Sequence, residues 1–149
     1  MQVREILRIK GKVLFTTTPD HCLADAVAAM AENDVGSLAV MGEGKMQGLL
    51  TFREVLKAVD ESKGNIAAMR VEEVMMRNPM TAHPSMETNE LRRLLLANHQ
   101  RYVPVMDGTT LMGVLSLMDV AKSVLEDQTF ENQMLKTYIK HWPAEERVG

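Results

Sequence analysis

Two stretches of the chain, Gly48-Leu49-Leu50-Thr51-Phe52-Arg53-Glu54 and Gly113-Val114-Leu115-Ser116-Leu117-Met118-Asp119, carry one pattern 65 residues apart. Each is a short apolar run that ends in a hydroxyl residue, with an acidic residue three positions later. The match extends outward without a gap, from 16–59 onto 81–124, and ten of the 44 aligned positions are identical. Self-similarity of this length indicates one structural unit that occurs twice.

The order of predicted elements is the same in both copies. A proline, Pro19 or Pro84, precedes a segment with apolar residues at helical spacing. Two apolar runs joined by a glycine-containing turn follow, and such runs are typical of adjacent strands. A second helix is expected directly after Thr51 or Ser116. Each copy therefore predicts a β-α-β-β-α unit, and Pro104, inside one of the apolar runs, indicates a sheet edge or an irregular strand end.

The whole chain is expected to have an α/β (α+β) fold, in which two pseudo-symmetric repeats pack through small sheets around one core. The polar stretch 60–65 indicates the start of a linker. The predicted domains are the first repeat over 1–65, the second repeat over 66–127, and a C-terminal amphipathic helix and tail over 128–149.

The composition excludes several functional classes. With 46% hydrophobic and 25% charged residues, the chain has the composition of an ordinary soluble globular protein. Its net charge of −3 provides no basic stripe for nucleic acid. No apolar run approaches the roughly 18 residues that cross a membrane. The single cysteine, Cys22, favours a reducing compartment, and we expect a cytoplasmic protein.

Metal and catalytic sites are not predicted. The 13 methionines fall mainly on apolar helix and strand positions, as core residues do. The four histidines are scattered without the spacing of a zinc site. Neither a phosphate-binding glycine loop nor a nucleophile motif occurs. We expect no metal, no required cofactor and no enzymatic activity.

The tail lies outside the repeat and predicts an amphipathic helix. Phe130, Met134, Tyr138 and Trp142 recur every four residues, and Pro143 is expected to end the helix. This apolar stripe must be covered, either by the repeats of the same chain or by a second copy in a homodimer.

These features together resemble a tandem pair of cystathionine-β-synthase (CBS) domains, the Bateman module. The resemblance rests on the two duplicated stretches and on the segment 98–105, Asn-His-Gln-Arg-Tyr-Val-Pro-Val, and it covers about 3–127. It implies a free-standing regulatory module, often a homodimer, that binds AMP, ADP or ATP between its repeats and signals to a regulated protein. AMP is the ligand we expect first; NAD and S-adenosylmethionine are the alternatives.

The resemblance also implies two composite binding sites. One would combine Ser116 and Asp119 with the backbone around Val35, Gly36, Ser37 and Leu38. The pseudo-symmetric site would combine Thr51, Arg53 and Glu54 with Arg101, Tyr102 and Val103.

The chemistry of these residue types suits a nucleotide. A hydroxyl in the first turn of a helix lies beside free backbone amides and contacts phosphate. A carboxylate one turn further in accepts both ribose hydroxyls. Arg53 and Arg101 supply charge-assisted bonds to phosphate, and apolar side chains hold the adenine ring.

A structural interpretation of the same residues stays open. Thr51 with Glu54, and Ser116 with Asp119, each fit the capping box of a helix start. Glu54 stands where the family has Asp, and Met76 where many members have Thr. Both differences favour the Ser116/Asp119 site. They also favour the alternative function, a structural or protein-interaction homodimer without a specific ligand.

Overall fold

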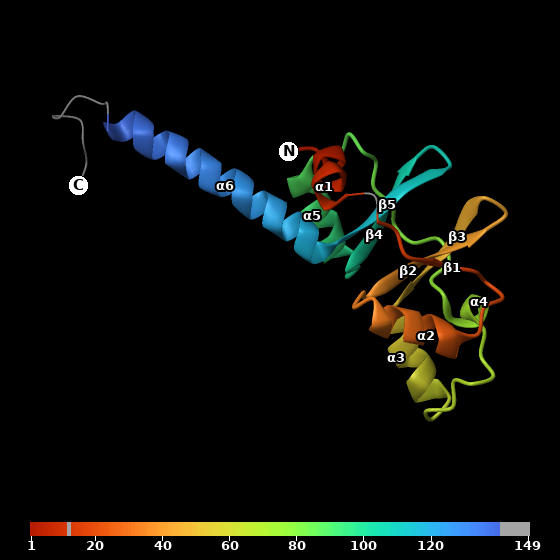
Figure 1. The fold of residues 1–149 in the computed structure, drawn as a ribbon. Helices are drawn as coiled ribbons and strands as arrows, with labels where there is room; N and C mark the ends of the chain where they lie inside the picture. Colours follow the sequence, from red (N-terminus) through yellow and green to blue (C-terminus); the bar gives the residue numbers. More distant parts are fainter. Residues whose placement is uncertain (12, 141–149) are drawn as a thin grey trace.

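The duplicated halves of the chain fold alike in the computed structural model, which describes residues 1–11 and 13–140 (Figure 1). The first repeat consists of β1 (Thr16–Thr17), α2 (Leu23–Glu32), β2 (Ser37–Gly42), β3 (Lys45–Thr51) and α3 (Phe52–Glu61). The second consists of α5 (Thr88–Ala97), β4 (Tyr102–Asp107), β5 (Thr110–Ser116) and α6 (Leu117–Lys140). The helices α1 (Val3–Lys10) and α4 (Val71–Val74) precede them. Trp142 and Pro143, predicted for the tail, lie outside the described residues.

The second repeat has the same antiparallel strand pairing as the first, including the same shift in register. Strands β2 and β3 are antiparallel, and so are β4 and β5. The register shifts between Val40 and Met41 in the first pair and between Val105 and Met106 in the second. These are equivalent positions with identical residues, so both hairpins bend at the same place.

The second repeat lacks the first strand that the sequence predicts for both copies. In the first repeat β1 runs parallel to β2, and the Ala39 amide donates to the Phe15 carbonyl at 3.1 Å. Pro104 stands at the position of Ala39 and has no amide proton, so the equivalent bond cannot form. Only Ala82 bridges to Val105. The prediction that Pro104 marks a sheet edge is confirmed by this two-stranded sheet.

The prediction of one shared core is wrong, because most of the buried hydrophobic residues fall into two clusters, one in each repeat. Each cluster is completed by the helix that precedes the other repeat. Val3 and Ile6 of α1 lie in the core of the second repeat, which follows later in the chain. Val71 and Met75, in and after α4, lie in the core of the first. The cores are separate, but each needs a segment from beyond its own repeat.

Backbone hydrogen bonds fix this exchange symmetrically. The Val3 amide donates to the Met86 carbonyl at 2.9 Å, and the equivalent Val71 amide donates to the His21 carbonyl at 3.0 Å. Two further pairs of equivalent bonds occur. The amides of Arg4 and Glu72 donate to the carbonyls of Pro84 and Pro19, respectively. The amides of Thr88 and Leu23 donate to the carbonyls of Met1 and Met69, respectively. The lead-in segments are therefore integral parts of the repeats that they contact.

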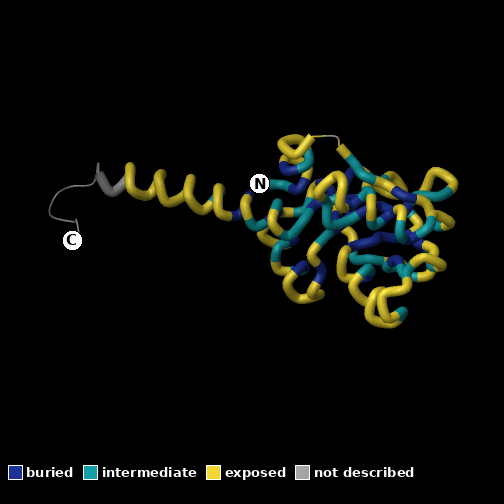
Figure 2. The backbone as a smooth tube through the Cα atoms, turned by 60° about the horizontal axis from the view of Figure 1, so that its bottom comes forward, coloured by how far each residue is buried: buried dark blue, intermediate teal, exposed yellow. Residues whose placement is uncertain are grey.

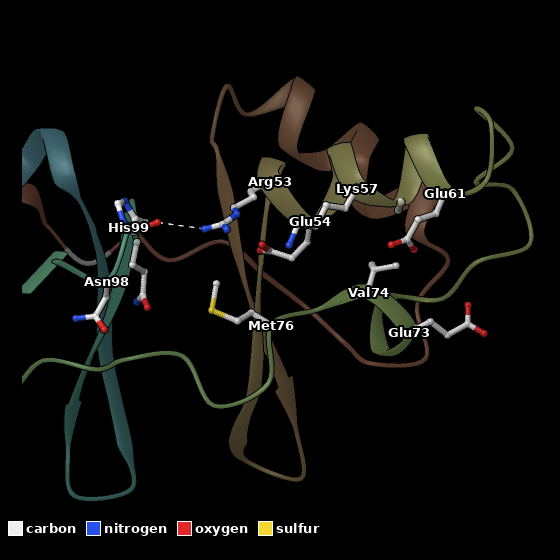
Figure 3. Close-up of a pocket in the computed structure, with 11 residues that line it drawn as sticks. Arg53, Glu54, Lys57, Glu61, Glu73, Val74, Met76, Asn98 and His99 are labelled. Carbon is white, nitrogen blue, oxygen red and sulfur yellow. Dashed lines mark hydrogen bonds between the residues drawn. The ribbon is translucent and has the colours of Figure 1, made fainter. Parts of the chain in front are cut away.

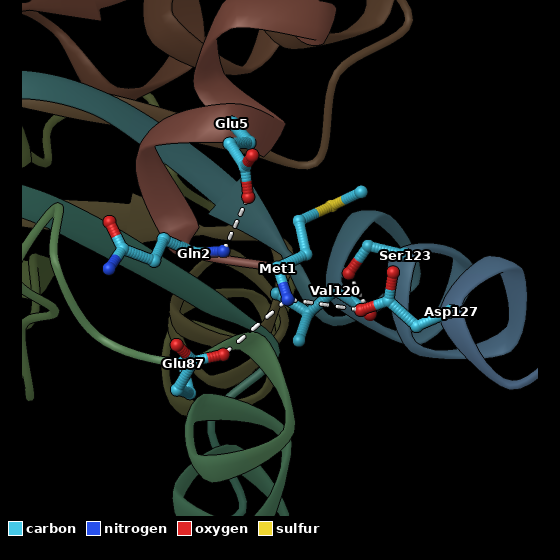
Figure 4. Close-up of polar contacts among 7 residues, drawn as sticks. All are labelled: Met1, Gln2, Glu5, Glu87, Val120, Ser123 and Asp127. Carbon is cyan, nitrogen blue, oxygen red and sulfur yellow. Dashed lines mark hydrogen bonds and ion pairs between the residues drawn. The ribbon is translucent and has the colours of Figure 1, made fainter. Parts of the chain in front are cut away.

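The amino group of Met1 reinforces the contact of α1 with the second repeat (Figure 4). Its nitrogen lies 3.4 Å from a carboxylate oxygen of Glu87 and 3.2 Å from one of Asp127. Glu87 precedes α5 and Asp127 belongs to α6, so this group joins three helices.

Helix α6 extends well beyond the body of the molecule (Figures 1 and 2). Its first turns pack on the second repeat through Val120 and Val124, which are buried. Further along, Phe130, Met134 and Leu135 are 57–64% exposed, and nothing in residues 1–11 and 13–140 covers them. Among the described residues no helix combines the length and apolar character that crossing a membrane requires.

Because α1 packs on the second repeat, we predict that substitutions of its two isoleucines lower the stability of the protein unequally. Ile6 is 6% exposed in the second core, whereas Ile9 is 74% exposed. Ile6→Ala should lower the free energy of unfolding by about 2–5 kcal/mol. Ile9→Ala, the matched control, should change it by no more than about 0.5 kcal/mol. Urea unfolding of both variants measures the difference, and equal small effects would contradict the packing of α1 on the second repeat.

Candidate functional site

Both strand–helix junctions are built in the same way. The Phe52 amide at the start of α3 donates to the Gly36 carbonyl at 3.1 Å, and the Leu117 amide at the start of α6 donates to the Arg101 carbonyl at 2.7 Å. Gly36 and Arg101 each stand directly before the strand that pairs with the junction. Each helix start is thus held at the beginning of the neighbouring strand.

A cavity of about 280 Å³ lies where the start of α6 meets the first repeat, and we call it the Asp119 pocket. The structure brings Ser116 and Asp119 of the second repeat together here with Gly36 and Ser37 of the first. These residues come from opposite halves of the sequence, as the resemblance implies. Leu38 does not line this cavity; it is 1% exposed, because alternation along β2 turns it into the core.

Ser116 and Asp119 form a complete capping box. The Ser116 amide donates to Oδ2 of Asp119 at 2.9 Å, and the Asp119 amide donates to Oγ of Ser116 at 3.0 Å. The structural interpretation of this pair is therefore confirmed. The box uses one carboxylate oxygen, Oδ2, so it leaves the other, Oδ1, for a further partner.

A residue that the sequence did not single out, Lys10, also binds Asp119. Its Nζ lies 2.8 Å from Oδ2 of Asp119 and 3.0 Å from the carbonyl oxygen of Val114. Burial alone raises the pKa of Asp119, but the bonds from Lys10 and Ser116 and the charge of Lys10 lower it below its ordinary value of 3.8. The carboxylate is therefore ionised at neutral pH.

An aromatic cluster separates this pocket from its pseudo-symmetric counterpart. The rings of Phe52 and Tyr102 meet edge to face with centroids 5.8 Å apart, and the Arg101 guanidinium lies 5.8 Å from the Phe52 centroid. A Cβ on Gly36 would overlap the Tyr102 hydroxyl, so a larger residue at this position would require the Tyr102 ring to move. Burial raises the pKa of Tyr102, which keeps its hydroxyl protonated.

Thr51 and Glu54 also form a capping box, and it is more enclosed than that of Asp119. The amide and the hydroxyl of Thr51 both donate to Oε1 of Glu54, at 2.9 and 2.7 Å. Glu54 is 8% exposed. Among the described residues it forms no ion pair, in contrast to Asp119.

The remaining predicted residues divide between two adjoining cavities. Thr51, Arg53, Arg101 and Tyr102 line one of about 660 Å³, which we call the Thr51 pocket. Glu54 lines another of about 460 Å³, the Glu54 pocket, which shares Arg53 with the first (Figure 3).

Two details of these cavities bear on the predicted second site. Nη1 of Arg53 donates to the His99 carbonyl at 3.2 Å, which joins the repeats (Figure 3). Met76 lines both cavities and supplies a thioether where the family often has a hydroxyl. Val103 is fully buried and lines neither cavity. This second site is thus divided, with its acid and its aromatic residues in different cavities.

Gln100 is a second residue that sequence reasoning missed. It is 8% exposed, and its amide group donates to the carbonyls of Met80 and Tyr102, each at 2.8 Å. It therefore holds the segment before α5 against β4, where Pro104 removes a strand bond. The signal available in the sequence was a glutamine close to the start of a predicted strand. In the described part of the chain, no cluster of three or more candidate metal ligands occurs.

Comparisons with known proteins agree with this architecture. The family model for the CBS domain matches residues 3–61 and 71–126. A putative signal-transduction protein with CBS domains from Burkholderia ambifaria has 33% sequence identity and a TM-score of 0.79, over 86% of this chain and 96% of that one. The mitochondrial CBS domain-containing protein CBSX3 of Arabidopsis thaliana is 28% identical over 93% of this chain and 71% of its own length.

A third similar structure contains a ligand. CBSX2 in complex with AMP has a TM-score of 0.70 and 23% sequence identity, over 85% of this chain and 98% of that one. This likeness shows a common fold.

The lowered pKa of Asp119 predicts a specific pH dependence of stability. Its pKa in the folded protein lies below the ordinary value of 3.8, so its stabilising contribution is complete above that pH and is lost on further acidification. Asp119→Asn should therefore be less stable than wild type at pH 7, and this difference should shrink as the pH falls below about 4.

Thermal unfolding from pH 7 to pH 3 measures this difference. Asp20, whose pKa is also lowered, chiefly by the hydrogen bond from Thr18, is present in both proteins and cancels. A difference that is constant across this range would show that the charge of Asp119 does not stabilise the fold.

Proposed function

Because the chain belongs to the CBS-domain family, we propose that it is a regulatory module that binds an adenine nucleotide, AMP first, in the Asp119 pocket. Ligand occupancy would be passed to a regulated protein through a shift between conformations of the module. We propose no reaction for it, and its single cysteine favours action in a reducing compartment such as the cytoplasm.

The observation that supports this site best is the composite geometry of the Asp119 pocket. A hydroxyl and an ionised carboxylate lie in the first turn of α6, facing the start of β2 in the other repeat. Such a helix start favours phosphate, and an adjacent carboxylate matches a ribose diol. The AMP complex of CBSX2 supports the proposal in so far as a protein of this fold holds AMP.

Capping and ligand binding are compatible roles for Asp119. The capping box occupies Oδ2, while a ribose hydroxyl has access to Oδ1. The capping box of Glu54 likewise uses one oxygen, Oε1, but Glu54 is largely buried, whereas Asp119 is partly accessible. The Asp119 pocket is therefore the better candidate of the two.

This proposal predicts that Asp119→Ala reduces both affinity and stability. Loss of charge-assisted bonds to ribose should weaken AMP binding by about ten- to a hundredfold, and loss of the cap should cost about 1 kcal/mol of stability. Calorimetric titration and urea unfolding of the same variant measure the two effects. Glu54→Ala should weaken binding less, because Glu54 lines a different cavity.

Asp25→Ala is the matched control, since it removes an exposed carboxylate from the first turn of α2, outside the described cavities. It should leave AMP affinity unchanged. For wild type, AMP at a hundred times its dissociation constant should stabilise the fold by about 2.7 kcal/mol. Wild-type protein that binds none of AMP, ADP, ATP, NAD and S-adenosylmethionine would support the structural homodimer instead, and normal binding by Asp119→Ala would place the site elsewhere.

We also propose that the module is a homodimer that uses the outer part of α6. Val120, Val124 and Asp127 mark the face of α6 that covers the second repeat, and the same spacing leads to Phe130 and Met134. Beyond the body, no described residue of the same chain lies beneath this face. A second copy presents the same stripe, so a twofold contact covers both at once.

The dimer predicts a light-scattering mass of twice the chain mass of 16.7 kDa at micromolar concentration. The double substitution Phe130→Ser with Met134→Ser should shift this mass toward the monomer, because it removes the apolar area that the contact buries. Gln133→Ser, an exposed polar position on the same part of α6, should leave the dimer intact. A monomeric wild type, or a double variant that stays dimeric, would contradict this use of α6.

A further inference from the structure

The ion pair between Lys10 and Asp119 crosses the Asp119 pocket. Both residues line the cavity, and both are partly accessible, with side chains 40% and 30% exposed. Oδ2 of Asp119 receives two donors, the Ser116 amide and the Lys10 ammonium. The carboxylate that would accept ribose is thus engaged by a cation of its own chain.

Lys10 owes this position to a difference between the two lead-in helices. Helices α1 and α4 start at equivalent valines, but α1 has eight residues and α4 has four. The additional turn ends in Lys10, and the amide of Gly11 closes it by donating to the Leu7 carbonyl at 3.0 Å. Val3 and Ile6 anchor this helix in the second core. The longer α1 therefore places the Lys10 ammonium in one of the two pseudo-symmetric pockets, the Asp119 pocket.

The charges around the pocket determine what happens when Lys10 leaves Asp119. Among the described lining residues the charged groups are Lys10, Asp34 and Asp119. One hydroxyl of a ribose diol has access to Oδ1, and the other competes with the Lys10 ammonium for Oδ2, which keeps the Ser116 amide as its capping donor. The Lys10 side chain is 40% exposed, so its ammonium then turns to solvent and loses the attraction of the carboxylate. A ligand that brings its own anion restores the pairing, whereas an uncharged nucleoside does not.

We propose that Lys10 is the residue by which this pocket selects a nucleotide with a 5′-phosphate over the corresponding neutral nucleoside. Its ammonium passes from Asp119 to the phosphate as the ribose takes the carboxylate. The flexible four-carbon stem of lysine permits this exchange while α1 stays in place. The inference rests on nucleotide binding in the Asp119 pocket and deepens it, because it names the group that recognises phosphate.

The test compares two ligands that differ only in the phosphate, AMP and adenosine. Calorimetric titration gives the ratio of the adenosine to the AMP dissociation constant for each protein. Lys10→Met should lower this ratio at least tenfold, which is the loss expected for a charge-assisted bond. AMP binding should weaken, while adenosine binding should stay the same or improve, since no ion pair has to be broken.

Two variants serve as controls. Lys10→Arg keeps the positive charge and should retain most of the ratio. Arg8→Met removes a charge from the same helix at an exposed position that does not line the pocket, and it should leave the ratio unchanged. Thermal unfolding of each variant confirms that it is folded before titration.

The outcomes separate this inference from the proposed function. If AMP binds to wild type and Lys10→Met changes both affinities by the same factor, Lys10 merely competes for Asp119. The phosphate role is then wrong while nucleotide binding stands. If neither AMP nor adenosine binds to wild type, the proposed function fails and the role of Lys10 fails with it.

Discussion

The exchange of lead-in helices is the constraint on which the rest of the structure depends. Each repeat has a sheet of two or three strands covered by two helices, and its core includes apolar side chains from the segment before the other repeat. Burial of Val3 and Val71, both fully inaccessible, stabilises the two repeats only when they lie side by side. Because the repeats are held together in this way, pockets form between them from residues of both.

The two repeats share this architecture, but their capping acids differ in exposure and in ion pairing. The junction bonds, the register shifts and the capping boxes occur in both copies. Asp119, however, is partly accessible and paired with Lys10, whereas Glu54 is largely buried and serves its cap. One extra helical turn before the first repeat creates this difference. Duplication therefore supplied two similar positions, and a short change in a remote segment made one of them electrostatically distinct.

Much of the fold could be predicted from the sequence because its patterns are local. Apolar runs on either side of a glycine turn indicate paired strands, and the hydroxyl and acid three apart indicate a helix start. The missing first strand of the second repeat follows from Pro104, since an amide proton is absent where the ladder needs one. The single-core prediction failed because the lead-in segments match only loosely, so their crossing between repeats was not visible.

As with the fold, the parts of the site that depend on local patterns were predictable, and the contacts between residues far apart in the sequence were not. Ser116 and Asp119 were predictable as a pair, and the family resemblance placed them opposite Gly36 and Ser37. The side chains of Leu38 and Val103, carried over by position, face the cores, because side chains alternate along a strand. Lys10 lies 109 positions from Asp119 in the sequence, and no local pattern connects them.

Helix α6 provides a physical link between the proposed pocket and the proposed dimer contact. Its first turn contains Asp119, and its far part presents Phe130 and Met134. With 24 residues, it spans about 36 Å. In the proposed function, a ligand that displaces Lys10 from Asp119 would alter the contacts between α1 and the start of α6, and a small change in direction there would become a large displacement at the outer end. The ligand can shift this equilibrium only by its difference in affinity between the two arrangements. The proposed exchange of Lys10 from carboxylate to phosphate would supply such a difference, because the ligand would bind more tightly in the arrangement in which the Lys10 ammonium reaches its phosphate.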